Sequence, residues 1–175
     1  MRPTRYGGLE WTGYTAAGRE RYEAGVRGLS ESERPDDSAK ELLVYANAGT
    51  RDRAEKALLS SGVAELERID LLRLDPLVRL RGETFGDYAV ESRSGGLYID
   101  SRTAALFSLD GTKPGAEPGP ALRQMEEHLI GAVECDGGLL YIIDAQLAEL
   151  AERIARAYGC SAALREWSEF SSERS

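Results

Sequence analysis

Short runs of alternating apolar and polar residues fill positions 63–110 and are separated by Pro, Gly or Asp. Alternation with a period of two is typical of strands that bury one face of a sheet. Residues 92–96 and 100–103 contain the glycine, serine and aspartate residues that favour tight connections between antiparallel strands. The region therefore predicts an antiparallel meander, with three consecutive strands within 88–110. The apolar positions that would share its buried face there are Tyr88, Val90, Leu97, Ile99, Leu106 and Leu109.

A period of three to four residues replaces the alternation on both sides of this region. It predicts a helix at 145–158, which Asp144 would cap and Gly159 would end. The apolar run at 138–143, just before it, predicts a buried strand or a packed extended segment. The helical period also predicts helices at 16–29, 36–49, 50–61, 121–134 and 161–170, of which the second and third would form a hairpin.

The length of 175 residues fits one domain with a single hydrophobic core, and no internal repeat is visible in the sequence. The patterns predict a single-domain α+β fold in which an antiparallel β meander packs against several helices. Residues 1–35 show weak periodicity, and we expect an N-terminal segment that is helical or partly disordered. Residues 36–170 would form the α+β domain, and residues 171–175 a frayed tail.

Composition narrows the classes of partner and compartment. The formal net charge is -8 and the basic residues are scattered, which argues against a nucleic-acid partner. No apolar run reaches the ~18 residues that a membrane span needs, so we expect no membrane partner. Cys135 and Cys160 are too few for a disulfide scaffold and favour a reducing cytoplasm. Self-association stays open, because aromatic residues near both ends, including Trp11 and Trp167, could anchor an oligomeric scaffold.

One group of residues offers acid-base or metal chemistry. Glu127, His128, Glu134 and Asp136 bring three carboxylates close in sequence to the only histidine of the chain. General acid-base catalysis and metal binding both use these residue types. Their spacing matches no known metal motif, so a solvated helix face is the simpler interpretation, and no cofactor is predicted. The catalytic alternative is a small enzyme or accessory protein of a bacterial biosynthetic pathway.

The order of elements in the middle of the chain also matches a known family pattern. The predicted helix at 50–61 ends in a Gly-apolar step and precedes a strand meander that contains Asp100, Thr103 and the apolar run 105–107. In this order, residues 50–135 resemble the SUKH superfamily, particularly its immunity-protein branch. The resemblance implies a non-enzymatic α+β protein that binds a toxin domain of the nuclease or deaminase class and neutralises it by occlusion.

The same resemblance implies a basic toxin domain as the partner, which an acidic edge of the meander would meet. An acidic surface steers association with a basic protein, although net charge also keeps many proteins in solution. On this interpretation, the partner-binding residues would be the carboxylates and tyrosines of the hairpins: Asp87, Tyr88, Glu91, Tyr98, Asp100 and Asp110.

Overall fold

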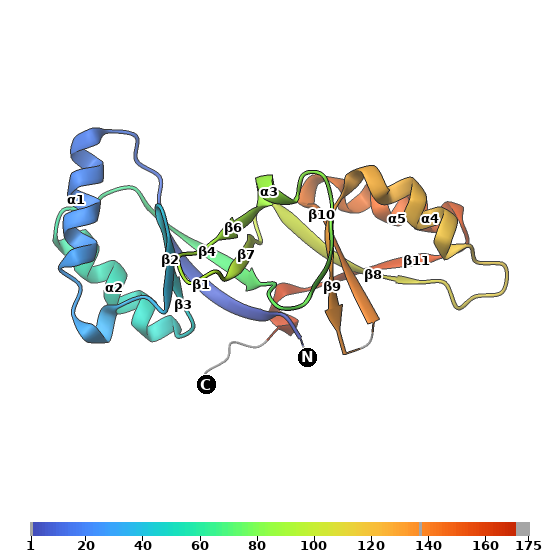
Figure 1. The fold of residues 1–175 in the computed structure, drawn as a ribbon, viewed down its shortest axis with the longest axis horizontal. Coiled ribbons are helices and arrows are strands. Elements are labelled where there is room, and N and C mark those ends of the chain that lie inside the picture. The colour runs from blue at the N-terminus through green and yellow to red at the C-terminus, as the bar shows by residue number, and fades with distance from the viewer. Residues whose placement is uncertain (1, 137, 171–175) are drawn as a thin grey trace.

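The strands of the protein form two antiparallel sheets, which lie one after the other along its long axis (Figure 1). The computed structural model describes residues 2–136 and 138–170. In spatial order, sheet A consists of β2 (Asp37–Ala39), β3 (Leu42–Tyr45), β1 (Thr4–Trp11), β4 (Leu66–Arg73), β7 (Leu97–Asp100) and β6 (Ala89–Glu91). Sheet B consists of β11 (Ser161–Arg165), β8 (Ala104–Asp110), β10 (Gly138–Asp144), β9 (Leu129–Cys135) and β5 (Val78–Arg81).

The segments of the chain that form the two sheets run through the same order of strands and helices. In sheet A the order along the chain is β1, α1 (Ala16–Arg27), β2, β3, α2 (Ala48–Ser60) and β4. In sheet B it is β8, α4 (Pro118–Met125), β9, β10, α5 (Ala148–Ala157) and β11. Counted along the chain within each copy, the first strand lies between the third and the fourth, and the second strand pairs with the third. In sheet A the first strand is β1, and in sheet B it is β8. The chain therefore contains two copies of the split β-α-β topology, although its sequence shows no repeat.

Sheet A curls until its two edges meet. The backbone N–H of Arg93, in the turn between β6 and β7, donates to the carbonyl of Ser38 in β2 at 2.8 Å. This contact joins the ends of the strand order and makes the sheet an incomplete barrel. Buried side chains fill its interior, namely Tyr6, Leu42, Val44, Ala46, Ile69, Leu71 and Tyr98.

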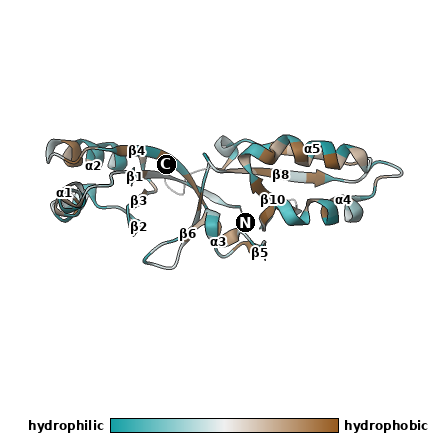
Figure 2. Ribbon diagram, turned by 90° about the horizontal axis from the view of Figure 1, so that it is seen from above, coloured by the Kyte–Doolittle hydropathy of each residue, from teal (hydrophilic) through white to brown (hydrophobic). Residues whose placement is uncertain are grey.

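Helices cover the outer face of sheet A and one face of sheet B. α1 and α2 pack on sheet A around Trp11 and Tyr22, whose rings stack with centroids 5.5 Å apart. α4 and α5 pack on sheet B around Phe107 and Met125. In Figure 2, α5 carries both hydrophobic and hydrophilic turns, as a helix with one buried face does. The two helix pairs stand at opposite ends of the molecule (Figure 1).

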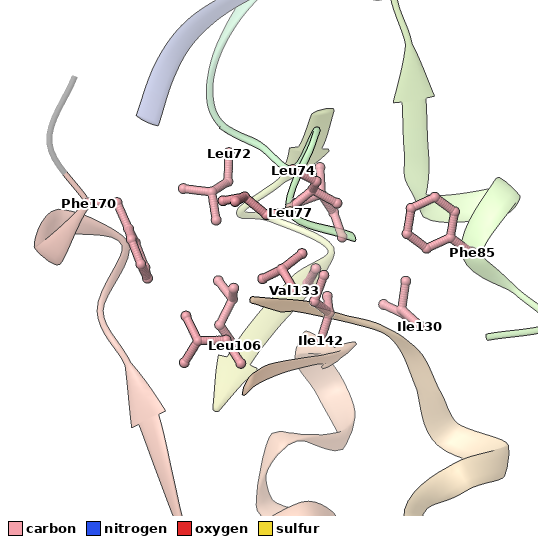
Figure 3. Packing of buried hydrophobic residues seen from close by; sticks show 12 residues of the cluster. Leu72, Leu74, Leu77, Phe85, Leu106, Ile130, Val133, Ile142 and Phe170 are labelled. Carbon is pink, nitrogen blue, oxygen red and sulfur yellow. The ribbon is translucent and has the colours of Figure 1, made fainter. Parts of the chain in front are cut away.

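A fourth hydrophobic core joins the two sheets (Figure 3). It lies between the end of β4 and the face of sheet B that the helices leave open. Because this core contains residues of both sheets, the two copies form one domain, and the predicted α+β fold class is confirmed. Its buried side chains include Leu72, Leu74, Leu77, Phe85, Leu106, Ile130, Val133, Ile142 and Phe170.

The elements with clear local signals match their predictions. The helices expected at 16–29, 50–61 and 145–158 are α1, α2 and α5, and the strand expected at 138–143 is β10. Asp144 accepts a hydrogen bond from the N–H of Gln146 at 2.7 Å, and so caps a short 3-10 helix, η3 (Ala145–Leu147), that leads into α5.

The helices predicted at 36–49, 121–134 and 161–170 are wrong in whole or in part. The first region forms β2 and β3, the second changes from α4 to β9 after the 3-10 helix η2 (Glu126–His128), and the third begins with β11. All four residues of β3 and the first five of β9 are buried. A strand that is buried on both faces has no two-residue alternation, so periodicity cannot separate it from a helix.

The predicted meander is divided between the two sheets. β6 and β7 form the expected hairpin, but β8 pairs with β10 and β11 of sheet B, and in the described part of the chain it pairs with no strand of sheet A. The predicted division at residue 35 is not a structural boundary, because β1 pairs with both β3 and β4 in the middle of sheet A. The predicted tail at 171–175 lies outside the described residues. In the described part of the chain, no helix is long and apolar enough to cross a bilayer.

Candidate functional site

A single helical turn, α3 (Phe85–Tyr88), stands where the chain passes from sheet B back to sheet A. Phe85 is buried, and its ring packs beside Gly131 of β9. A Cβ at position 131 would lie 2.7 Å from the carbonyl oxygen of Leu80 and 3.1 Å from the Phe85 ring. Glycine is therefore needed here for the close approach that holds α3 against sheet B.

Two cavities, with volumes of about 240 Å³ and 550 Å³, lie beside α3. Thr84 and Glu127 line both of them, so the cavities adjoin, and we call them together the α3 hollow. The smaller cavity reaches the end of β10, and the larger one lies between β5 and α4. The ionisable residues that line the α3 hollow are Arg81, Glu83, Tyr88, Arg123, Glu126, Glu127, His128 and Asp144.

Carboxylates outnumber cations in the α3 hollow. Four acidic side chains line it, against the guanidinium groups of Arg81 and Arg123. Arg81 lies over the ring of Phe85, 5.0 Å from its centroid. The side chain of Leu80, 42% exposed, adds apolar surface to the larger cavity. The hollow thus combines an excess of negative charge with an exposed aliphatic residue.

A hydrogen bond across the smaller cavity joins α3 to the end of β10. The hydroxyl of Tyr88 donates to Oδ2 of Asp144, while Oδ1 of Asp144 accepts the N–H of Gln146. The bond to Asp144 raises the pKa of the Tyr88 phenol, because ionisation would place two anions together. Tyr88 therefore stays protonated near neutral pH and acts here as a donor that fixes α3.

The predicted acid-base group is not brought together. His128 lies at the end of η2, and its Nε2 is 3.5 Å from Oε1 of Glu127, whose side chain is 80% exposed. Glu134 lies at the other end of β9, where Arg79 binds it, and Asp136 lies in the following turn, 3.4 Å from Arg2. An extended strand of this length separates its ends by roughly 20 Å. In the described part of the chain, no three His, Cys, Asp or Glu side chains are grouped to hold a metal ion.

The predicted partner-binding residues fall into two groups. Asp87, Tyr88 and Glu91 lie together on α3 and β6, beside the α3 hollow, and the two carboxylates are exposed. Tyr98, by contrast, is 1% exposed inside sheet A, where its hydroxyl donates to Asp37 at 3.2 Å. A buried side chain of this kind supports the sheet and is not available to a partner.

The other two predicted residues lie away from the hollow. Asp100 accepts a hydrogen bond from Nε of Arg102 at 2.8 Å, and the same guanidinium group also binds Glu10 and Glu67. Asp110 is at the far end of β8, where its carboxylate accepts the N–H of Thr112 at 2.9 Å. Asp100 is therefore engaged in an ion-pair network on sheet A, and Asp110 belongs to a different surface.

The aromatic residues near the termini are largely internal. Trp11, Tyr22 and Phe170 are each less than 5% exposed and belong to hydrophobic cores, whereas Tyr14 is 97% exposed. These side chains attach the ends of the chain to the fold. Sequence reasoning did not find Glu83 as a member of a site, since it reaches the α3 hollow only through the pairing of β5 with β9. Glu126 was included in the predicted acid-base group, and it lines the α3 hollow beside Glu127. The cap signal at Asp144 was recognised, but its contact with Tyr88 was not.

Comparison with other proteins leaves the function open. No protein-family model matches the chain, and no curated protein or solved structure matches it. The resemblance to the SUKH superfamily therefore stays a prediction.

Proposed function

We propose that the protein is a non-enzymatic binding protein of the immunity type, which occludes the active site of a basic toxin domain with its α3 hollow. The observation that carries the proposal is the meeting of Glu83, Glu126 and Glu127 with an exposed leucine in one depression. Protein interfaces combine apolar contact with complementary charge in this way.

The charge of the hollow suits the toxin class that the SUKH resemblance implies. A nuclease or nucleic-acid deaminase binds a polyanion and needs cationic side chains around its active site. A carboxylate-lined surface competes for those cations, and the net charge of -8 accelerates the encounter. The exposed carboxylates of Asp87 and Glu91 would extend the contact along α3 and β6. We assign the protein to the cytoplasm, a compartment that suits the free thiols of Cys135 and Cys160.

A comparison of two charge-reversed baits tests the proposal. The triple variant Glu83→Lys, Asp87→Lys, Glu126→Lys alters the hollow and its rim. The triple variant Glu20→Lys, Glu31→Lys, Glu149→Lys makes the same change in net charge at exposed positions elsewhere.

Each bait is used for affinity capture from the native lysate, and the affinity for a captured basic protein is then measured with purified components. We expect the wild type and the control variant to bind a nuclease-like or deaminase-like domain. The hollow variant should bind at least about tenfold more weakly, because like charges then face each other. Equal affinities of the two variants would reject the α3 hollow as the binding surface.

A small enzyme is the second candidate. Tyr88, His128 and Asp144 line one cavity of about 240 Å³, which offers a donor, a titratable imidazole and a carboxylate to a small substrate. The substitution His128→Ala distinguishes the candidates. An enzyme of this kind would lose activity while keeping its stability, whereas an immunity protein would keep its affinity for the toxin.

A further inference from the structure

A separate cavity of about 370 Å³ lies between α1 and the edge of sheet A. Arg19 and Arg27 reach it from α1, Lys40 from the turn between β2 and β3, and Arg93 from the turn between β6 and β7. These turns come together where sheet A closes, through the hydrogen bond from Arg93 to Ser38 and those from Ser92 and Ser94 to Asp37. We call this depression the α1 cavity.

Cations exceed anions in the α1 cavity, although the protein as a whole is acidic. Arg19 is 2.7 Å from Glu41, and Arg27 is 3.9 Å from Glu23. The remaining two cations, Lys40 and Arg93, form no ion pair within the described part of the chain. Four cationic side chains against two carboxylates leave an excess of two positive charges. A dianion would balance this excess.

The wall of the cavity also holds a hydroxyl group without a partner. Tyr22 is 4% exposed, and its hydroxyl oxygen is buried with no hydrogen bond to any described residue. Burial, as the main cause, raises the pKa of Tyr22 to about 12; the charge of Glu41 raises it as well, and the charge of Arg93 lowers it. The phenol therefore keeps its proton near neutral pH. Buried hydroxyls are nearly always hydrogen-bonded, so the Tyr22 hydroxyl has a proton to donate to an acceptor bound in the cavity.

We propose that the α1 cavity binds the phosphate group of a small phosphomonoester, with Lys40 and Arg93 as its principal cations and Tyr22 as a hydroxyl donor. A phosphomonoester is a dianion near neutral pH and has several acceptor oxygens, which suit guanidinium, ammonium and phenol donors. The volume exceeds what a phosphate alone needs and lies within the range of small-molecule sites. Val26, Ala39 and Leu43 supply apolar wall for the esterified group.

This inference does not depend on the proposed toxin binding. The α1 cavity is built from α1 and the closing edges of sheet A, whereas the α3 hollow is built from β5, α3 and α4. No described residue lines both.

Isothermal titration calorimetry at low ionic strength tests the proposal, with phenyl phosphate, inorganic phosphate and phenol as the probes. We expect saturable binding of phenyl phosphate, weaker binding of inorganic phosphate and none of phenol. The variant Lys40→Gln, Arg93→Gln should bind phenyl phosphate at least about tenfold more weakly, because two charge-assisted contacts are lost. The control Lys113→Gln, Arg156→Gln, which removes two exposed cations from the sheet B copy, should bind like the wild type.

Tyr22→Phe provides an independent readout. Its affinity for phenyl phosphate should fall by about three- to tenfold, while the melting temperature without ligand should not decrease, because the removed hydroxyl has no partner in the unliganded fold. Absence of saturable binding, or equal weakening in the control variant, would overturn the site. Phenyl phosphate binding no more tightly than inorganic phosphate would overturn the phosphomonoester and assign the cavity to the free anion.

Discussion

The hydroxyl of Ser92 donates a hydrogen bond of 2.5 Å to Oδ2 of Asp37, and this contact ties the β6–β7 turn to the opposite edge strand of sheet A. Ser94 and Tyr98 donate to the same oxygen, and the N–H of Ser38 donates to the other at 2.8 Å. Ser92 itself is only 7% exposed. The carboxylate of Asp37 and the backbone bond from Arg93 to Ser38 together close a gap that no strand pairing bridges.

Asp37→Ala should lower the free energy of unfolding by about 1–3 kcal/mol, because the buried hydroxyls of Ser92 and Tyr98 lose their acceptor. Urea denaturation measures the change. Glu20→Ala is the matched control, since this exposed carboxylate on α1 should change stability by less than about 0.5 kcal/mol. Coincident transitions for the wild type and the Asp37 variant would show that the contact does not hold the edges together.

Asp37 should also make the fold sensitive to acid. Burial raises the pKa of its carboxyl, but the hydrogen bonds from Ser92 and Ser94 outweigh burial, and the pKa lies below its usual value. A carboxyl with a lower pKa in the folded state stabilises the fold above its unfolded pKa, and this contribution disappears as the pH falls through the folded pKa.

We therefore expect the free energy of unfolding to decline below about pH 4, as measured by urea titrations at a series of pH values. Asp37→Asn should make the decline less steep without abolishing it, because the pKa of Asp75 is also lowered. If the free energy of unfolding fell equally steeply with pH in the wild type and in Asp37→Asn, Asp37 would not be a source of the acid sensitivity.

The core between the sheets should make the two copies unfold together. Ile142→Ala removes a fully buried side chain of this core and should cost about 2–5 kcal/mol. In a Trp167→Phe background, the fluorescence of Trp11 reports on the helix-covered core of sheet A. Its unfolding midpoint should shift together with that of the whole protein.

The control is Leu164→Ala on β11, where the side chain is 44% exposed and the midpoint should change little. If Ile142→Ala lowered the unfolding midpoint measured by circular dichroism but not the midpoint measured by Trp11 fluorescence, the two copies would unfold separately.

The bond between Tyr88 and Asp144 should contribute stability as well as position. Tyr88→Phe keeps the ring and removes the donor, and we expect a loss of about 0.5–1.5 kcal/mol in the free energy of unfolding. Tyr14→Phe serves as the control, because Tyr14 is 97% exposed. If Tyr88→Phe and Tyr14→Phe had the same free energy of unfolding, the bond would not hold α3 in place.

Local signals were enough for some elements and failed for others. α5 could be predicted because its apolar stripe and the cap at Asp144 lie within a few residues of each other. The β6–β7 hairpin could be predicted because its turn needs Gly95, whose φ is +84°. β3 and β9 could not, since they are buried on both faces and lack alternation.

The sequence by itself determined the α+β class, the antiparallel hairpin, the helices with clear caps and the acidic character of the protein. Only the tertiary structure decided that β8 leaves the meander, that one topology occurs twice, and that Tyr88 meets Asp144 across 56 positions. Caps, turns and alternation act over a few residues. Long-range pairing depends on which apolar faces cover each other, and no local pattern encodes that choice.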